Sequence, residues 1–172
     1  MKTRKRKPRM ARPAVSKRSA SNPLVRIDNW PSLLEQELQA RFARPFVWGE
    51  NDCCIFAASL VEAMTGVDLA AKWRGRYTKA LGAGRFLKKE GGLEGLMQKL
   101  AAKHAMEALP SVLYARRGDV VLMDVPTTVA TNGESAGGPA LGICVGARVA
   151  AAGENGVVFV PLEQARRAWR VG

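Results

Sequence analysis

The segment from Asn51 to Met64 restricts the fold of this chain more than any other. Asn51 and Asp52 are both favourable N-cap residues, and they stand directly before an apolar run that stops at Thr65-Gly66. Apolar side chains within the run follow helical spacing, at Cys53, Phe56, Ala57, Leu60 and Met64. The pattern predicts a central, largely buried helix that carries a cysteine at its start.

Further elements are predicted on both sides of this helix. Helices are expected over about 30–43, 79–89 and 93–104, and strands over about 120–125, 140–145, 147–152 and 157–160. Helices therefore precede strands, which predicts an α+β fold and not an alternating parallel sheet. The polar, glycine-rich segment 127–138 is predicted to be a mobile loop.

The charge is concentrated at the N-terminus. Residues 1–27 contain ten Lys or Arg and no acidic residue, which accounts for +10 of the formal net charge of +12. Residues 1–23 are predicted to be a disordered basic arm and 24–172 a single domain, since the arm has too few apolar residues to form a core. Residues 1–22 are expected to bind nucleic acid or an acidic protein surface, and the alternative is a solubilising extension.

Several classes of protein and site are not expected. No run of about 20 apolar residues is present, so no membrane span is predicted, and no apolar region follows the basic residues as in a signal peptide. Three cysteines without regular spacing indicate a reduced, intracellular protein. Those cysteines and the one histidine also lack metal-ligand spacing, so neither a metal nor a small-molecule cofactor is predicted.

Two candidate sites remain. Cys53 stands where the positive end of the predicted helix would stabilise a thiolate, and the alternative is a packing or vestigial role, since small thiols are often buried. The only histidine, His104, ends another predicted helix and shows no relation to Cys53. Arg74 and Arg76, in a basic and aromatic loop, are candidate anion ligands, and the alternative is a solvated loop.

Several short motifs follow one another along the chain, and their order resembles that in a known family. They are Trp48-Gly49, Asn51-Asp52-Cys53, Thr65-Gly66, Arg74-Gly75-Arg76-Tyr77, Gly91-Gly92, Gly118-Asp119-Val120-Val121, Leu141-Gly142-Ile143-Cys144-Val145-Gly146 and Ala168-Trp169-Arg170. Their order resembles the NlpC-type cell-wall cysteine peptidases, a circularly permuted papain-like group, and most closely a branch found in tailed phages and prophages. The resemblance covers about residues 30–172.

The resemblance implies a papain-like fold, with N-terminal helices packed on a small antiparallel sheet or half-barrel. It assigns Cys53 to the nucleophile position. Ala140 stands where the active peptidases have their catalytic histidine, and Ala150-Ala151-Ala152 where a polar residue would orient it. Because a cysteine nucleophile depends on a base, the chain is predicted to be an inactive member.

The function implied is that of a phage virion structural protein, in the tail or tail tip, with other tail proteins as partners. Such a protein is made in the bacterial cytoplasm and resides in the virion. Two alternatives stay open. One is an active peptidoglycan endopeptidase that uses Cys53, and the other is a nucleic-acid binding module that acts through the basic arm.

Overall fold

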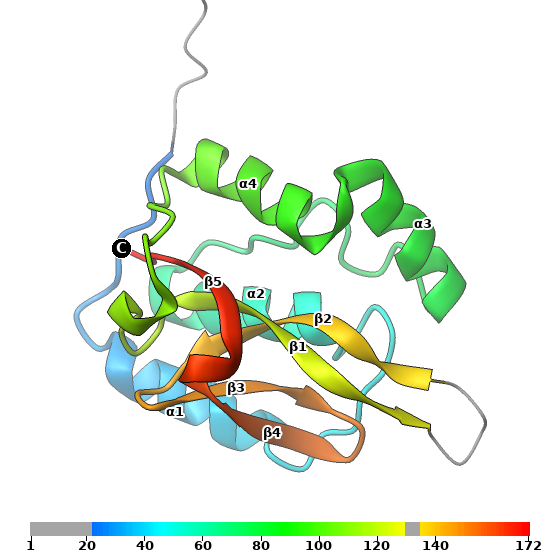
Figure 1. Ribbon diagram of the computed structural model, residues 1–172. Coiled ribbons are helices and arrows are strands. Elements are labelled where there is room, and N and C mark those ends of the chain that lie inside the picture. Colours follow the sequence, from blue (N-terminus) through cyan, green and yellow to red (C-terminus); the bar gives the residue numbers. More distant parts are fainter. Residues whose placement is uncertain (1–21, 130–134) are drawn as a thin grey trace, which may run out of the picture.

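The computed structural model of the protein describes residues 22–129 and 135–172 (Figure 1). The predicted basic arm therefore lies outside the described residues, apart from Asn22 and Pro23. The Asn22 amide already donates to the Lys103 carbonyl at 3.0 Å. Asn22, the first described residue, is thus attached to the end of the helix that contains Lys103.

The described part of the chain has four α-helices, all before residue 105. They are α1 Trp30–Arg41, α2 Cys53–Thr65, α3 Ala80–Glu90 and α4 Gly92–His104. Gly66 ends α2 in the left-handed conformation with φ of 71°, and Gly91 at 87° separates α3 from α4. All four predicted helices are confirmed, with ends displaced by only a few residues.

Within residues 22–129 and 135–172, five strands follow the helices and form one antiparallel sheet. They are β1 Val120–Val129, β2 Ser135–Cys144, β3 Arg148–Gly153, β4 Gly156–Pro161 and β5 Ala165–Trp169, in the spatial order β4-β3-β2-β1-β5. Single 3₁₀ turns, η1 Val112–Tyr114 and η2 Leu162–Gln164, precede β1 and β5. The predicted α+β class is confirmed.

Both faces of the sheet are covered, because its strands alternate between two apolar clusters. Leu141 and Ile143 of β2 belong to the larger cluster with α1, α2 and α4, whereas Cys144 belongs to a second cluster with Val149 of β3. Leu109, Val112 and Leu162, from the connecting segments, cover that second face. In Figure 1, α1 and α2 lie against the sheet, and the α3–α4 pair forms a further layer beyond α2.

Two details of the sheet differ from the sequence-based expectation. The predicted mobile loop 127–138 is wrong at both ends, because β1 continues to Val129 and β2 starts at Ser135; residues 130–134 lie outside the described ones. Backbone pairing needs no apolar side chains, and the register shifts between Val125 and Thr128, around a proline that has no amide to donate. Strand β5 was not predicted, since Arg166 and Arg167 interrupt its apolar pattern.

None of the helices in the described part of the chain has the length and apolarity that crossing a bilayer requires.

Candidate functional site

Asp52 organises the start of α2. One carboxylate oxygen accepts hydrogen bonds from the amides of Cys54 and Ile55, both at 3.0 Å, and the other accepts from the Gly49 amide at 2.8 Å. The side chain is buried, so all three bonds are shielded from water. Asp52 therefore caps the helix and also fixes the turn that delivers Cys53 to its first position.

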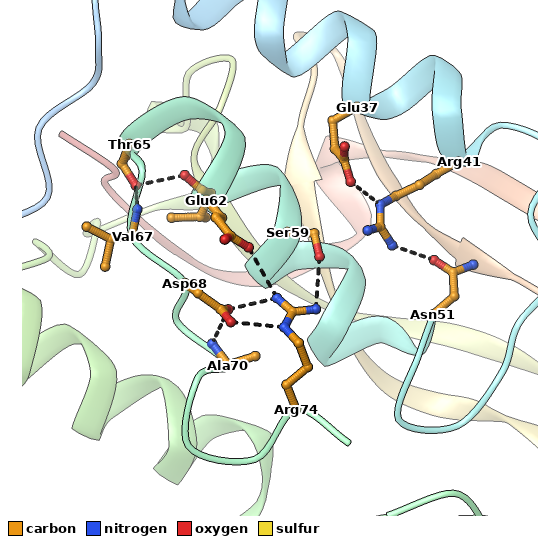
Figure 2. A network of polar contacts seen from close by, with 11 residues as sticks. Glu37, Arg41, Asn51, Ser59, Glu62, Thr65, Val67, Asp68, Ala70 and Arg74 are labelled. Atoms are coloured by element: carbon orange, nitrogen blue, oxygen red, sulfur yellow. Dashed lines mark hydrogen bonds and ion pairs between the residues drawn. The ribbon is translucent and has the colours of Figure 1, made fainter. Parts of the chain in front are cut away.

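Asn51 secures the connection between α1 and α2. Its side-chain oxygen accepts from Arg41 at 2.8 Å, while its nitrogen donates to the carbonyls of Arg44 and Pro45 at 3.1 and 2.9 Å. Arg41 in turn donates to Glu37 at 2.6 Å, and Figure 2 shows this chain of contacts. The Asn-Asp pair of the motif is thus structural, and its effect on Cys53 is one of placement.

Cys53 is half-buried and lies against Cys54 and the backbone of β2. The Cys54 thiol, acting as a donor, lowers the pKa of Cys53, and the amides of Leu141 and Cys54 add to this effect. Burial and the charge of Asp52 oppose it without reversing it. The neighbouring Cys54 is fully buried and its pKa is raised, first by its bond to Cys53. Cys53 is therefore the thiol of the pair that ionises.

Strand β2 supplies a backbone amide to Cys53 but no side chain that accepts a proton. Leu141 belongs to the cluster that contains α2, and Ala140 precedes it on the strand. Ala140 pairs with Met123, which belongs to the second cluster, so its methyl group lies on the sheet face away from α2. The β2 residue whose backbone amide reaches Cys53 is Leu141, one position after the Ala140 that the resemblance indicates.

The position expected for an orienting polar residue is also apolar. Ala150 and Ala151 of β3 are fully buried, and Ala152 packs against the larger cluster. Small apolar side chains fill these places in the sheet, so neither β2 nor β3 presents a group for general-base chemistry beside Cys53.

His104 lies at the far end of α2 from Cys53. The Leu24 amide donates to the His104 carbonyl, and three residues later the Ile27 amide donates to the carbonyl of Met64, near the C-terminal end of α2. The thirteen residues of α2 extend about 18 Å. His104 is buried with Nδ1 at 3.1 Å from the Asn22 carbonyl, so it belongs to the packing of the first described residues.

Tyr77 is a residue near Cys53 that sequence reasoning did not single out by itself. A Cβ atom on Gly49, where φ is 78°, would lie 1.9 Å from the Tyr77 carbonyl oxygen, so this approach requires glycine. Burial raises the pKa of Tyr77, and the charges of Asp52 and Cys54 raise it further. Tyr77 therefore stays protonated and cannot serve as a base for Cys53.

The two candidate anion ligands have different surroundings. Arg74 donates to Asp68 at 2.8 and 2.9 Å, to Ser59 at 3.3 Å and to Glu62 at 3.4 Å, so it joins the loop after α2 to that helix (Figure 2). The bonds to Asp68 raise the pKa of Arg74. Arg76 is exposed and lines a cavity under α3 and α4. Asp68 and Glu62 lie 6 and 12 positions before Arg74, and no local sequence pattern with these spacings indicates an ion pair.

Metal-binding side chains do not gather within residues 22–129 and 135–172, where no group of three or more His, Cys, Asp or Glu could hold an ion.

Comparison with known proteins gives one match. Neither the curated proteins nor the solved structures include a significant match to this chain. A family model described as "Domain of unknown function" matches residues 25–171, which is nearly the whole chain. The match begins in the segment before α1 and ends after β5, so it includes every helix and strand described above. The protein therefore belongs to the family Domain of unknown function (DUF6950).

Proposed function

We propose that this protein is a catalytically inactive relative of the NlpC-type, papain-like cysteine peptidases and serves as a structural component of a phage tail or tail tip. The observation that carries the proposal is the state of Cys53. Its thiol is held at the start of α2 with a lowered pKa, yet the strand beside it contributes the Leu141 amide and no base, and Ala140 faces away from α2.

The arrangement of elements supports the papain-like part of the proposal. A cysteine at the first position of a buried helix lies against the second strand of an antiparallel sheet, and helices precede strands. The Gly118-Asp119 and Ala168-Trp169-Arg170 motifs meet in space, because Asp119 accepts from Arg170 and Val120 pairs with Trp169. The motifs that carry the resemblance thus act together in closing the domain.

The loss of activity follows from the chemistry of the thiol. General acid–base catalysis contributes about 10²- to 10⁴-fold to rate, and the leaving group of an amide needs a proton that only a conjugate acid can supply. Among the described residues, β2 and β3 offer the polarised Cys53 thiol no such partner. A Cys53 thiolate can thus react with a strong electrophile but lacks the means to complete amide hydrolysis.

An exposed apolar surface supports a role in assembly. Phe42 after α1 is 57% exposed and Phe159 of β4 is 43% exposed, and both line a cavity of about 170 Å³ beside the edge strand. Edge strands with apolar side chains are natural contact sites for other chains. The expected neighbours are other tail proteins, and residues 1–22 would add an electrostatic contact to an acidic surface or nucleic acid.

The test is a phage that carries Cys53→Ala, with Cys54→Ala as the matched control. Purified particles are analysed by mass spectrometry for the protein, and their titre is measured. The proposal expects the protein in the particles and an unchanged titre for both variants. Absence of the protein from particles would overturn the proposed role in the virion. A loss of titre that is confined to Cys53→Ala, with normal incorporation of the protein, would overturn the proposal that the protein is catalytically inactive.

A second candidate function, an active peptidoglycan endopeptidase, is favoured by the lowered pKa of Cys53. It predicts that the purified protein releases soluble fragments from isolated peptidoglycan, and that Cys53→Ala abolishes the release while Cys54→Ala preserves it. Under the inactive proposal, all three proteins leave the peptidoglycan intact.

A further inference from the structure

A cavity of about 540 Å³ lies between the loop 72–77 and the paired helices α3 and α4. It is distinct from the surroundings of Cys53, although Tyr77 contributes to both. Its volume falls in the range of sites that hold small molecules, about 300–1,000 Å³.

The lining of the cavity is strongly basic. Five basic side chains face one acidic one, a net charge of +4, and they are Lys72, Arg76, Arg85, Lys89, Lys99 and Glu90. Glu90 is already paired with Lys99 at 2.8 Å. The other four cations make no ion pair with any described residue, in contrast to Arg74 close by, which is held by two carboxylates.

The wall behind these cations is aromatic. Phe86 of α3 stacks on Trp73 with ring centroids 5.4 Å apart and on Tyr77 at 5.9 Å. Trp73 and Tyr77 are buried, whereas Phe86 is only half-buried and presents part of its ring. The Trp73 indole N–H has no hydrogen-bond acceptor among the described residues. The cavity thus combines unpaired cations with an accessible aromatic surface.

We propose that this cavity binds a phosphorylated small molecule of nucleotide size. Four cations around so small a volume repel one another, and an anion with several charges close together relieves that repulsion. Phosphoryl groups provide such charge density, and the planar guanidinium groups of Arg76 and Arg85 suit phosphate oxygens. Phe86 offers a surface on which a ring of the ligand can pack. The proposal gives the anion predicted for Arg76 a chemical class and a site, and it does not depend on the proposed function.

The test is isothermal titration calorimetry of the full chain at physiological salt, with three probes. ATP has a triphosphate group and an adenine ring. Tripolyphosphate has the charged phosphates without the ring, and adenosine has the ring without the phosphates. The proposal expects ATP to bind with one site per chain, tripolyphosphate to bind more weakly, and adenosine to bind weakest.

Two neighbouring lysines of α3 provide a matched pair of variants. Lys89 lines the cavity, and Lys88 is equally exposed on the same helix but does not line it. Lys89→Ala and Arg85→Ala should each weaken ATP binding about tenfold, and Lys88→Ala about twofold or less. All three side chains are exposed, so each variant should fold, which circular dichroism checks.

Failure of ATP to bind would overturn the proposal. Equal weakening by Lys88→Ala and Lys89→Ala would also overturn it, since that result reports general surface charge. ATP binding that is unchanged in Arg85→Ala and Lys89→Ala would overturn it as well, because the affinity would then belong to the basic arm.

Discussion

Arg26 donates a hydrogen bond to Asp119 at 2.9 Å and so joins two residues that are 93 positions apart. The Asp119 carboxylate is completely buried and also accepts from Arg170 and from the Val171 amide. Asp119, the residue before β1, thereby holds Arg26 of the segment that precedes α1 together with Arg170 and Val171 near the C-terminus.

Replacing Asp119 should destabilise the domain strongly. Asp119→Ala leaves Arg26 and Arg170 without their shared counter-ion in a largely buried place, and we expect a loss of about 3 kcal/mol or more in the free energy of unfolding. Urea denaturation measures this. Asp124, which pairs with Arg166 at the surface, is the control, and Asp124→Ala should cost less than about 1 kcal/mol. Similar losses for the two variants would contradict the role given to Asp119.

Asp52→Ala should weaken the start of α2. Three amides lose their acceptor, those of Gly49, Cys54 and Ile55, so the free energy of unfolding should fall by about 2 kcal/mol. Thermal unfolding measures the change, with the exposed Asp28→Ala as a control that should stay near the wild type. An unaltered midpoint for Asp52→Ala would show that the cap contributes little.

Thiol labelling across pH should separate the two adjacent cysteines. The pKa of Cys53 is lowered by the Cys54 thiol and that of Cys54 is raised by the same bond, so labelling at neutral pH should occur at Cys53. Because the thiolate is the reactive form, the rate should rise with pH and level off below the pKa of about 8.5 of a free cysteine. Peptide mass spectrometry locates the label.

Cys53→Ser is the control for that experiment, and it should remove the labelling at neutral pH. Slow labelling of the wild type that begins only in alkali would instead identify Cys53 as an inert packing residue. That outcome would strengthen the inactive reading and remove the observation that favours an endopeptidase.

Asp68 should make the stability of the domain depend on pH in the acidic range. Burial acts to raise its pKa, but the bonds from Arg74 and the Ala70 amide outweigh that effect and lower it. A lowered folded-state pKa stabilises the fold above the unfolded pKa of about 3.9, and this contribution is lost as the pH falls through the folded value. Wild type should therefore exceed Asp68→Asn in stability at pH 7, with a difference that shrinks in acid.

Urea denaturation at several pH values gives this difference. The exposed Glu163, which makes no ion pair with described residues, supplies the control variant Glu163→Gln, for which the difference should stay small at every pH. A difference between wild type and Asp68→Asn that grows in acid has the wrong sign and would refute the assignment.

Removal of residues 1–21 separates the arm from the domain. The truncated chain keeps Asn22 and all of the described contacts, so its thermal midpoint should match that of the full chain. Its incorporation into particles should fall, because nine Lys or Arg are lost. Undiminished incorporation of the truncated chain would count against a role of the arm in assembly. If the full chain binds nucleic acid with a steep salt dependence and the truncated one does not, the nucleic-acid alternative gains support.

Much of the fold can be predicted from the sequence, because local chemistry determines it. Asp52 and Gly66 bound α2 by capping, and Gly91 divides α3 from α4, each through an effect confined to a few neighbouring residues. Strand β5 escapes prediction because Arg166 and Arg167 follow one another at the sheet edge, where neither needs to be buried.

The candidate site is less predictable, since its contacts join distant residues. The Leu141 amide beside Cys53 and the Ser59 hydroxyl beside Arg74 are placed by the tertiary fold. The orientation of Ala140 is equally hard to predict, because the alternation of side chains along the strand decides which face of the sheet its methyl group occupies. The NlpC-type assignment and the tail role stay predictions.

The strap formed by residues 22–27 has a mechanical consequence. Its amides bond to the ends of α4 and α2, and Arg26 donates both to the buried carboxylate of Asp119 and to the carbonyl of Val171 near the C-terminus. A pull on the preceding arm by a neighbouring molecule would not peel away a loose terminus. The tension would pass at once into two helices and the C-terminal strand, so the domain would bear the load as one body.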